Sequence, residues 1–239
     1  MADTSLLKNF NATCGGGLVL NKDVYDMQPG EALQLINFEP STEGGYRRLN
    51  GTTKYNSTIV PQVSLANERI QMSAIFNDKI IVARGGTVSY GDTSGSWTSL
   101  ATSQGGTYTY DFDKFNFSGT SKIIIATGEA AAFTVNTSFA VDVINATGGG
   151  TAPTNPKFVK TFANHVFYGG MSNSTHSILF SVPFSEDNFT SGSGAGEIKV
   201  GDVVTGLKVF RDELFIFCQR KIYKLTGTSS TNFALAEVA

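Results

Sequence analysis

The chain has 239 residues, enough to bury a sizeable core as one all-β domain or as one domain with an appendage. Only 16% of the residues are charged, while Gly and Phe number 26 and 18, a composition that favours strands and tight turns over helices. A net charge of −2 without a basic stripe argues against sequence-specific nucleic-acid binding, and the longest apolar runs are too short to predict membrane insertion.

Residues 1–65 do not follow the pattern of the rest and are expected to form an N-terminal extended arm with small strands. Residues 18–20 are a short apolar strand, and Pro29-Gly30 is a strong turn signal. Residues 46–49 lead into Asn50-Gly51, a dipeptide typical of hairpin turns. The predicted domains are therefore an arm region, 1–65, and a repeat domain, 66–239.

The start of the arm is a candidate interface, because it holds too few apolar side chains to form a core of its own. Such a segment is either disordered or buried against another subunit, for example as a strand added to a neighbour's sheet edge. The expected interface residues are Leu6, Leu7, Phe10, Leu18, Val19 and Leu20.

The N-terminus has no apolar run of the length of a secretory signal, so synthesis in the cytoplasm is expected. The two cysteines, Cys14 and Cys218, lie far apart in the sequence. Cys218 follows an apolar strand, which predicts a buried free thiol rather than a disulfide or a metal ligand.

Residues 75–90 predict a β-meander, three short strands with two tight turns. Asn77-Asp78 tolerates left-handed backbone and favours a hairpin turn between an apolar run ending at Phe76 and the strand 79–83. Gly85-Gly86 allows a second reversal before residues 87–90 resume the alternation of a half-buried strand.

The same unit returns three times downstream. Aromatic residues before the predicted turn, Phe76, Phe117, Phe162 and Phe210, are spaced by 41, 45 and 48 residues. A period of 40–50 residues with about four strands is that of a β-propeller blade, and the near-constant spacing favours a propeller over an antiparallel sandwich. We therefore predict an all-β, β-propeller-like fold of about four meander blades, possibly incomplete.

The apolar second strands of these units are expected to lie mid-blade, between neighbouring blades, where both faces are buried. The predicted core residues are Ile80, Val82, Ile123, Ile125, Val166, Phe215 and Phe217.

No catalytic, cofactor-binding or metal-binding residues are predicted, and the chain is not expected to be an enzyme. His165 and His176 lie on separate predicted strands without Cys or carboxylates at ligand spacing. Five acids could serve a glycosidase-like propeller, but Asp111 and Asp113 fit one strand face, and Glu186 and Asp187 fit a surface turn. They are Asp111, Asp113, Glu129, Glu186 and Asp187.

The N-terminal quarter resembles tail and neck structural proteins of tailed bacteriophages, in particular the propeller-bearing nozzle proteins of short-tailed phages. The matching stretches are Gly16-Gly17-Leu18, Pro29-Gly30-Glu31-Ala32, Asn37-Phe38 and Gly44-Gly45-Tyr46-Arg47-Arg48. The repeat domain matches only in style, and such nozzle proteins are usually far longer. The chain is either a shortened relative or part of a longer product.

The resemblance implies a virion structural protein, made in the cytoplasm of a bacterial host and located in a tail or neck through which DNA is ejected. Its expected partners are copies of itself, forming a ring, and other tail or neck proteins. The alternative function is a carbohydrate-binding or glycosidase-like β-propeller.

Overall fold

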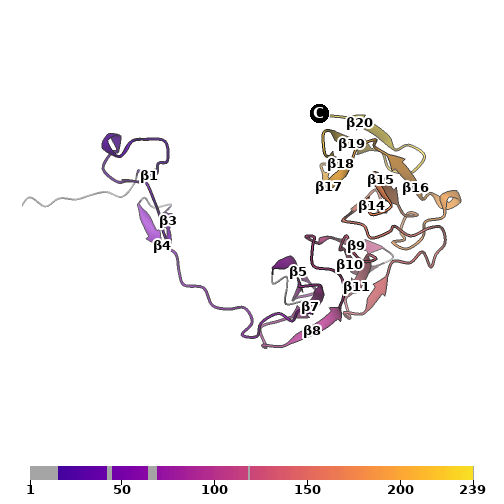
Figure 1. The fold of residues 1–239 in the computed structure, drawn as a ribbon, viewed down its shortest axis with the longest axis horizontal. Helices are drawn as coiled ribbons and strands as arrows, with labels where there is room; N and C mark the ends of the chain where they lie inside the picture. Colours follow the sequence, from indigo (N-terminus) through magenta and orange to yellow (C-terminus); the bar gives the residue numbers. More distant parts are fainter. Residues whose placement is uncertain (1–15, 42–44, 64–68, 118, 239) are drawn as a thin grey trace, which may run out of the picture. The chain divides into compact units, whose positions relative to one another are not determined.

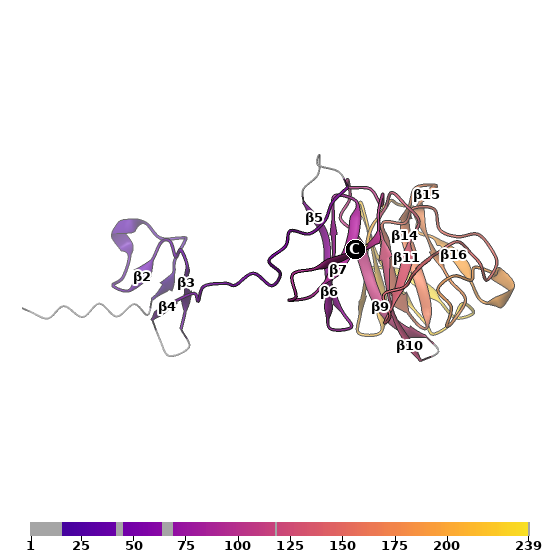
Figure 2. The same cartoon turned by 90° about the horizontal axis from the view of Figure 1, so that it is seen from below.

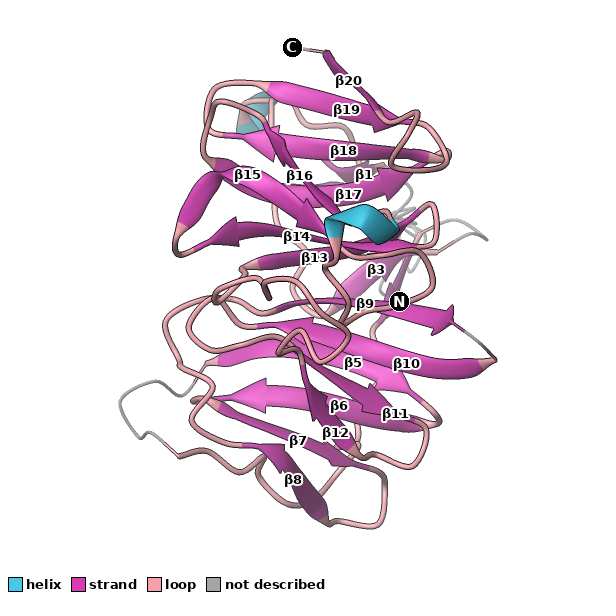
Figure 3. Cartoon of the chain, turned by 90° about the vertical axis from the view of Figure 1, so that its right-hand side faces the viewer, coloured by secondary structure: helices cyan, strands magenta, loops and turns pink. Residues whose placement is uncertain are grey.

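A computed structural model of the chain describes residues 16–41, 45–63, 69–117 and 119–238. Regular structure in this part is almost wholly strand, with two short 3-10 helices, Val24–Asp26 and Ser191–Ser193 (Figure 3). None of its helices is long and apolar enough to cross a membrane. The chain divides into two units, residues 1–54 and 55–239. The second unit begins earlier than the predicted repeat domain, because residues 55–63 bond to its first blade.

The first unit is built of short strands. In its described part, β1 (Gly17–Leu18) pairs in parallel with β2 (Glu31–Ala32), and β3 (Phe38–Pro40) pairs antiparallel with β4 (Tyr46–Arg48). Tyr46 donates a hydrogen bond from its hydroxyl to the Gly30 carbonyl at 3.1 Å and so ties the two small sheets together.

The second unit contains four antiparallel meander sheets within the described residues, which confirms the β-propeller-like fold. Each sheet is a blade whose four strands follow chain order. Blade 1 is β5 (Ile70–Phe76), β6 (Lys79–Arg84), β7 (Thr87–Gly91) and β8 (Trp97–Ala101); blade 2 is β9 (Asp111–Phe117), β10 (Thr120–Ala126), β11 (Phe133–Asn136) and β12 (Val141–Val143); blade 3 is β13 (Phe158–Phe162), β14 (His165–Met171), β15 (Ser174–Phe180) and β16 (Gly196–Lys199); blade 4 is β17 (Val204–Phe210), β18 (Glu213–Cys218), β19 (Ile222–Thr226) and β20 (Ala234–Glu237).

The blades follow one another along the chain in a curved row (Figures 1 and 2). The first strands β9, β13 and β17 lie side by side, as expected of the inner strands of a propeller. Among the described residues, strands of blade 4 make no extensive contact with strands of blade 1. The row is therefore an open arc of blades rather than a closed ring.

The hairpins between the first and second strands have the predicted turns. Asn77 and Asp78 adopt φ of 46° and 60°, Ala163 and Asn164 adopt 49° and 64°, and Arg211 and Asp212 adopt 49° and 59°. Two consecutive residues with positive φ are the signature of a type I′ turn, whose twist matches that of paired strands. In blade 2 the turn includes Gly119 at φ 81°, while Ser118 lies outside the described residues.

The core is divided among the blade interfaces, with one apolar cluster in each of the three interfaces of the described arc. Ile81 and Ile123 lie in the cluster between blades 1 and 2, and Ile124 and Tyr168 in the cluster between blades 2 and 3. Phe167 belongs to the cluster between blades 3 and 4. Alternation of side chains along each second strand therefore serves two interfaces at once.

Four of the seven predicted core residues are buried, three of them in the middle blades 2 and 3. Val82 is 6% exposed, and Ile123, Ile125 and Val166 are fully buried, as predicted. The prediction was wrong for Phe217, which is 38% exposed, and incomplete for Ile80 and Phe215, which are half-buried. The two Phe point away from blade 3 in the last described blade. Ile80 points away from blade 2 and is half-buried, although Val82 on the same face is buried.

Candidate functional site

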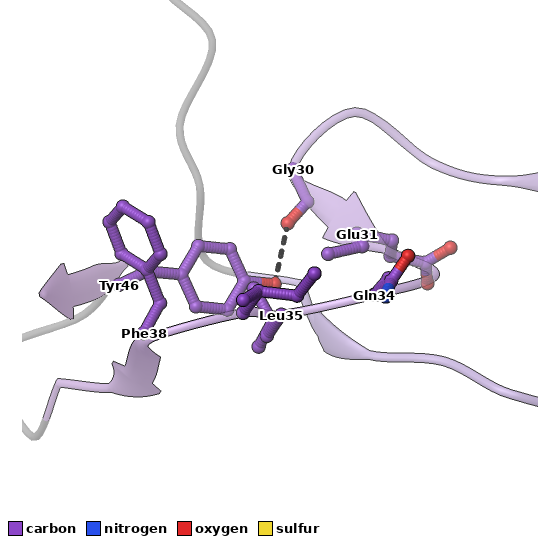
Figure 4. Close-up of a pocket in the computed structure, with 8 residues that line it drawn as sticks. Gly30, Glu31, Gln34, Leu35, Phe38 and Tyr46 are labelled. Atoms are coloured by element: carbon purple, nitrogen blue, oxygen red, sulfur yellow. Dashed lines mark hydrogen bonds between the residues drawn. The ribbon is translucent and has the colours of Figure 1, made fainter. Parts of the chain in front are cut away.

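The first unit has no buried residue among those described. Its most evident feature is an apolar groove of about 600 Å³ lined by Leu35, Ile36, Phe38 and Tyr46, among others (Figure 4). Ile36 is 64% exposed and Phe38 47% exposed, so both present large apolar surfaces to solvent. Because burial of apolar area is the main source of folding free energy, this unit gains little from its own packing and suits a docking segment.

The predicted interface residues lie partly in this unit. Leu6, Leu7 and Phe10 fall outside the described residues. Leu18 lies in β1 and is 47% exposed, and Leu20 just beyond it is 78% exposed. Val19 is half-buried, and its backbone N–H donates to the Ala32 carbonyl at 2.9 Å. Leu18 and Leu20 are therefore available for contact with another molecule.

In the second unit, the inner strands of blades 2, 3 and 4 border a groove of about 480 Å³. Asp111 accepts from the Lys160 ammonium at 2.6 Å and from the Val159 backbone N–H at 3.0 Å. Asp113 accepts from both the backbone N–H and the hydroxyl of Thr161, each at 2.6 Å. The two carboxylates thus join the inner strand of blade 2 to that of blade 3.

The other weighed acids also hold loops or blades together. Asp187 accepts from the backbone N–H groups of residues 145–147 at 2.6–2.9 Å and from the Thr147 hydroxyl, so it fills a nest of donors in the loop after blade 2. Glu186 is paired with Lys122 of blade 2. Glu129 accepts from the backbone N–H and the hydroxyl of Thr107 at 2.9 and 2.7 Å. All five carboxylates have partners within the fold.

The histidines lie on separate strands, as predicted. His165 is fully buried against the rings of Phe167, Phe180 and Phe233, and its Nδ1 lies 2.5 Å from the Ser181 carbonyl. Burial lowers the pKa of His165 below its usual value, and the contact with Ser181 opposes that shift. Its Nε2 has no partner.

The second histidine is exposed. Nδ1 of His176 lies 2.9 Å from the Thr175 hydroxyl. Within the described ranges, no three His, Cys, Asp or Glu side chains are grouped so that they could hold a metal ion. Neither histidine therefore belongs to a recognisable ligand set in that part of the chain.

The single described cysteine is less buried than expected. Cys218 is half-buried at the end of β18, beside the apolar cluster between blades 3 and 4, and is a free thiol. Desolvation raises the pKa of this thiol, and nearby Asp202 raises it further. The position favours a packing role over a reactive one.

The two end blades have outward faces that the arc leaves without a neighbouring blade. On blade 4 this face carries Phe210, 56% exposed, and Phe217. On blade 1 it carries Ile75, which is 65% exposed. Phe217 was predicted to lie in the core, because alternation predicts which side chains share a face but not whether a neighbour covers that face.

Residues 55–63 bond to blade 1 at the end of β6, just after β7 and at the start of β8. The Trp97 indole N–H donates to the Thr58 carbonyl at 2.9 Å, and the Arg84 guanidinium donates to the Val60 carbonyl at 2.8 Å. The Asn56 amide donates to the Asp92 carbonyl at 2.8 Å. This segment is therefore bonded to the second strand as well as to the outer part of the blade, whereas Ile75 on the inner strand stays exposed.

No protein-family model and no curated protein matches this chain. Similar solved structures include BBS1N in complex with ARL6DN, with TM-score 0.45, 10% identity, and coverage of 66% of this chain and 48% of that chain. PorZ, a surface component of the type-IX secretion system of Porphyromonas gingivalis, gives TM-score 0.44 and 12% identity, with coverage of 72% of this chain and 21% of that chain. The N-terminal domain of Nup159 gives TM-score 0.42 and 11% identity, with coverage of 78% of this chain and 54% of that chain. The chain spans about half or less of the length of the first two, and these comparisons place it in no family.

Proposed function

We propose that the chain is a structural protein of a bacteriophage tail or neck, of the nozzle type, that assembles as a ring and lines the path of DNA ejection. Its partners are copies of itself and other tail or neck proteins, and its place is the virion, after synthesis in the host cytoplasm. It acts through protein contacts, without catalysis, a cofactor or membrane insertion. The resemblance of the N-terminal quarter to phage tail and neck proteins motivates the virion assignment.

The observation that carries the assembly part is the character of the first unit. Its described residues include none that is buried, yet Leu18, Leu20, Ile36 and Phe38 expose large apolar side chains. Packing of such a segment against another subunit is favourable, because that subunit then covers apolar surface that the isolated chain leaves in water. In a ring, the adjacent copy is the natural subunit to receive it.

The second unit has features suited to a rigid body in such a particle. Carboxylates of blade 2 bond the inner strand of blade 3, and Asp187 bonds three successive backbone N–H groups after blade 2. These hydrogen bonds to charged acceptors add to the apolar clusters between blades and oppose sliding of one blade on another.

Three measurements test this proposal. The protein should appear in purified virions by mass spectrometry, and negative-stain images of the purified protein should show rings. Deleting residues 1–20 should leave a folded protein, by circular dichroism, that enters particles poorly. Normal incorporation of the truncated protein would contradict the role given to the arm. Absence of the full-length protein from every particle fraction would refute the virion assignment.

A carbohydrate-binding or glycosidase-like propeller is the second candidate, and the groove along the inner strands favours it. That groove is bordered by Asp111, Asp113, Lys160 and Lys208, which offer both hydrogen-bond donors and acceptors to a sugar. We rank it second because both carboxylates already accept hydrogen bonds from blade 3. Binding on a glycan array that is lost in a Lys208→Ala variant would favour this function.

A further inference from the structure

The charged side chains in the described part of the first unit fall into paired and unpaired groups. Lys22 is paired with Glu31 at 2.7 Å. Arg47 is paired with Glu39 at 2.5 Å. The other charged side chains in residues 16–41 and 45–54 have no ion-pair partner among the described residues, and they are Asp23, Asp26, Arg48 and Lys54. This part of the unit therefore presents two unpaired acids and two unpaired cations.

The two acids lie together on an exposed turn, residues 23–26, which we call the acidic turn. Asp23 caps the 3-10 helix Val24–Asp26, and its side chain accepts from the Tyr25 backbone N–H at 3.1 Å. The Asp26 backbone N–H donates to the Asp23 carbonyl at 3.0 Å, so the turn is held by its own hydrogen bonds. Val24 is 63% exposed and Tyr25 is 97% exposed. The turn thus presents a tyrosine, a residue type enriched at interface hot spots, between two carboxylates.

Arg48 borders a hollow of about 540 Å³ at the end of β4, which we call the Arg48 hollow. The Leu49 backbone N–H donates to the Asn37 carbonyl at 2.9 Å and joins the two segments that form the hollow. Arg48 and Asn50 are exposed, and their side chains can donate hydrogen bonds to a carboxylate. The described residues that line the hollow include no acid, and they are Asn37, Arg48, Leu49, Asn50, Gly51 and Thr52.

The acidic turn and the Arg48 hollow lie at opposite ends of the first unit. The 3-10 helix is the coiled ribbon in the connection between β1 and β2, and the hollow lies where the chain leaves β4 (Figure 1). The unpaired charges of opposite sign therefore do not meet within one copy. Two copies placed head to tail bring the acids of one copy to the cations of the other, so the two surfaces are complementary in charge.

We propose that the first units of adjacent copies bind head to tail, with the acidic turn of one copy seated in the Arg48 hollow of the next. Asp26 pairs with the Arg48 guanidinium, and Tyr25 packs on its planar face. Each copy uses a different surface toward each neighbour, and repetition of such a contact gives a ring when its rotation closes. The contact names the surfaces of the ring assembly in the proposed function and rests on it for the existence of self-association.

The test is charge reversal, measured by sedimentation velocity of the full chain. Asp26→Lys and Arg48→Glu should each lower the association constant at least about tenfold, because like charges then face each other in the contact. A double variant that carries both substitutions again brings opposite charges together, and it should recover most of the lost association. Raising the ionic strength should weaken association of the wild-type chain, since salt screens exposed charges.

Two further variants serve as controls. Arg47→Glu makes the same charge change one residue earlier, where the side chain points to the opposite face of β4 and pairs with Glu39. This variant should associate like the wild type, because an exposed ion pair contributes little to stability. Tyr25→Ala removes the aromatic side chain without a change in charge, and it should also weaken association. The double variant separates loss of contact from loss of folding, because a second charge change does not repair a misfolded unit.

The outcomes distinguish this contact from the proposed function. A double variant that associates no better than the single variants would overturn the contact. Wild-type rings that form with unchanged strength in Asp26→Lys and Arg48→Glu would overturn it as well, and would leave the ring assembly intact. A wild-type chain that stays monomeric at high concentration would overturn both. Recovery of association in the double variant supports the contact even if the protein is absent from every particle fraction, a result that would refute the virion assignment alone.

Discussion

Replacing Phe167 by Ala should be among the most destabilising single changes in the second unit. The side chain is fully buried, and its ring centroid lies 5.3 Å from that of Phe180 and 5.6 Å from that of Phe233. Phe180 belongs to the same blade, while Phe233 lies beyond β19 in blade 4. Truncation would leave a cavity at the interface of two blades, where relaxation of both sheets is restricted.

The expected loss in the free energy of unfolding is about 3–5 kcal/mol, the range for Phe→Ala in a packed core. With a urea m-value of about 2 kcal/mol per molar, the midpoint would fall by about 1.5–2.5 M. Phe217→Ala is the matched control, because Phe217 occupies a second strand in blade 4 and is 38% exposed. Its loss should be below about half that of Phe167→Ala when both are measured at protein concentrations where the chain is monomeric.

The measurement is urea denaturation followed by Trp97 fluorescence and by circular dichroism, with the m-value fitted for each variant. A Phe167→Ala loss under about 1 kcal/mol with an unchanged m-value would contradict the packing of blade 3 on blade 4. An equal loss for the two variants would also contradict the reasoning, because it would mean that a following blade covers Phe217 within the same chain.

Other predictions concern single groups. Burial lowers the pKa of His165 in the folded chain, so its contribution to the free energy of unfolding should be complete above about pH 6.5, where the unfolded histidine is neutral. Stability should fall as the pH drops from there toward the lowered folded pKa, by at most about 1.4 kcal/mol per pH unit. His165→Asn should remove this dependence in pH-resolved denaturation, and a dependence that persists would assign it to other groups. Asp187→Ala should cost about 1–3 kcal/mol and speed amide exchange of residues 145–147, whereas unchanged exchange would mean that the carboxylate is not their acceptor. Ala163→Asn, which suits φ of 49° better than Ala, should raise the thermal midpoint slightly, by the equivalent of up to about 1 kcal/mol; a lower midpoint would show that the side chain clashes.

The sequence predicted the features that depend on neighbouring residues along the chain. Asn77-Asp78 and Arg211-Asp212 signal their turns because their own side chains tolerate positive φ, and the structure has both turns. The spacing of Phe76, Phe117 and Phe162 predicts the blade period for a similar reason, since each meander is a local unit.

Features that depend on distant residues could not be read in the same way. Phe215 and Phe217 look like core residues in sequence, but within the described arc no blade packs on their face, which leaves Phe215 half-buried and Phe217 38% exposed. The partners of Asp187 lie about 40 residues earlier in the sequence, and no local pattern connects them. The exposed apolar faces of the end blades were missed for this reason, although the parity of side chains along β6 and β18 correctly indicated which residues share a face.

The separation of the core into one apolar cluster per blade interface has a consequence for how the second unit unfolds. Each described blade contacts only its neighbours along the row, so its stability is the sum of an intrinsic part and of one or two coupling energies. The first and last blades have one coupling each, and the middle blades have two. Opening should therefore begin at the ends and propagate inward, in the manner of fraying in a linear array. Closing the row would convert both end blades into middle ones and raise the cooperativity of the whole unit.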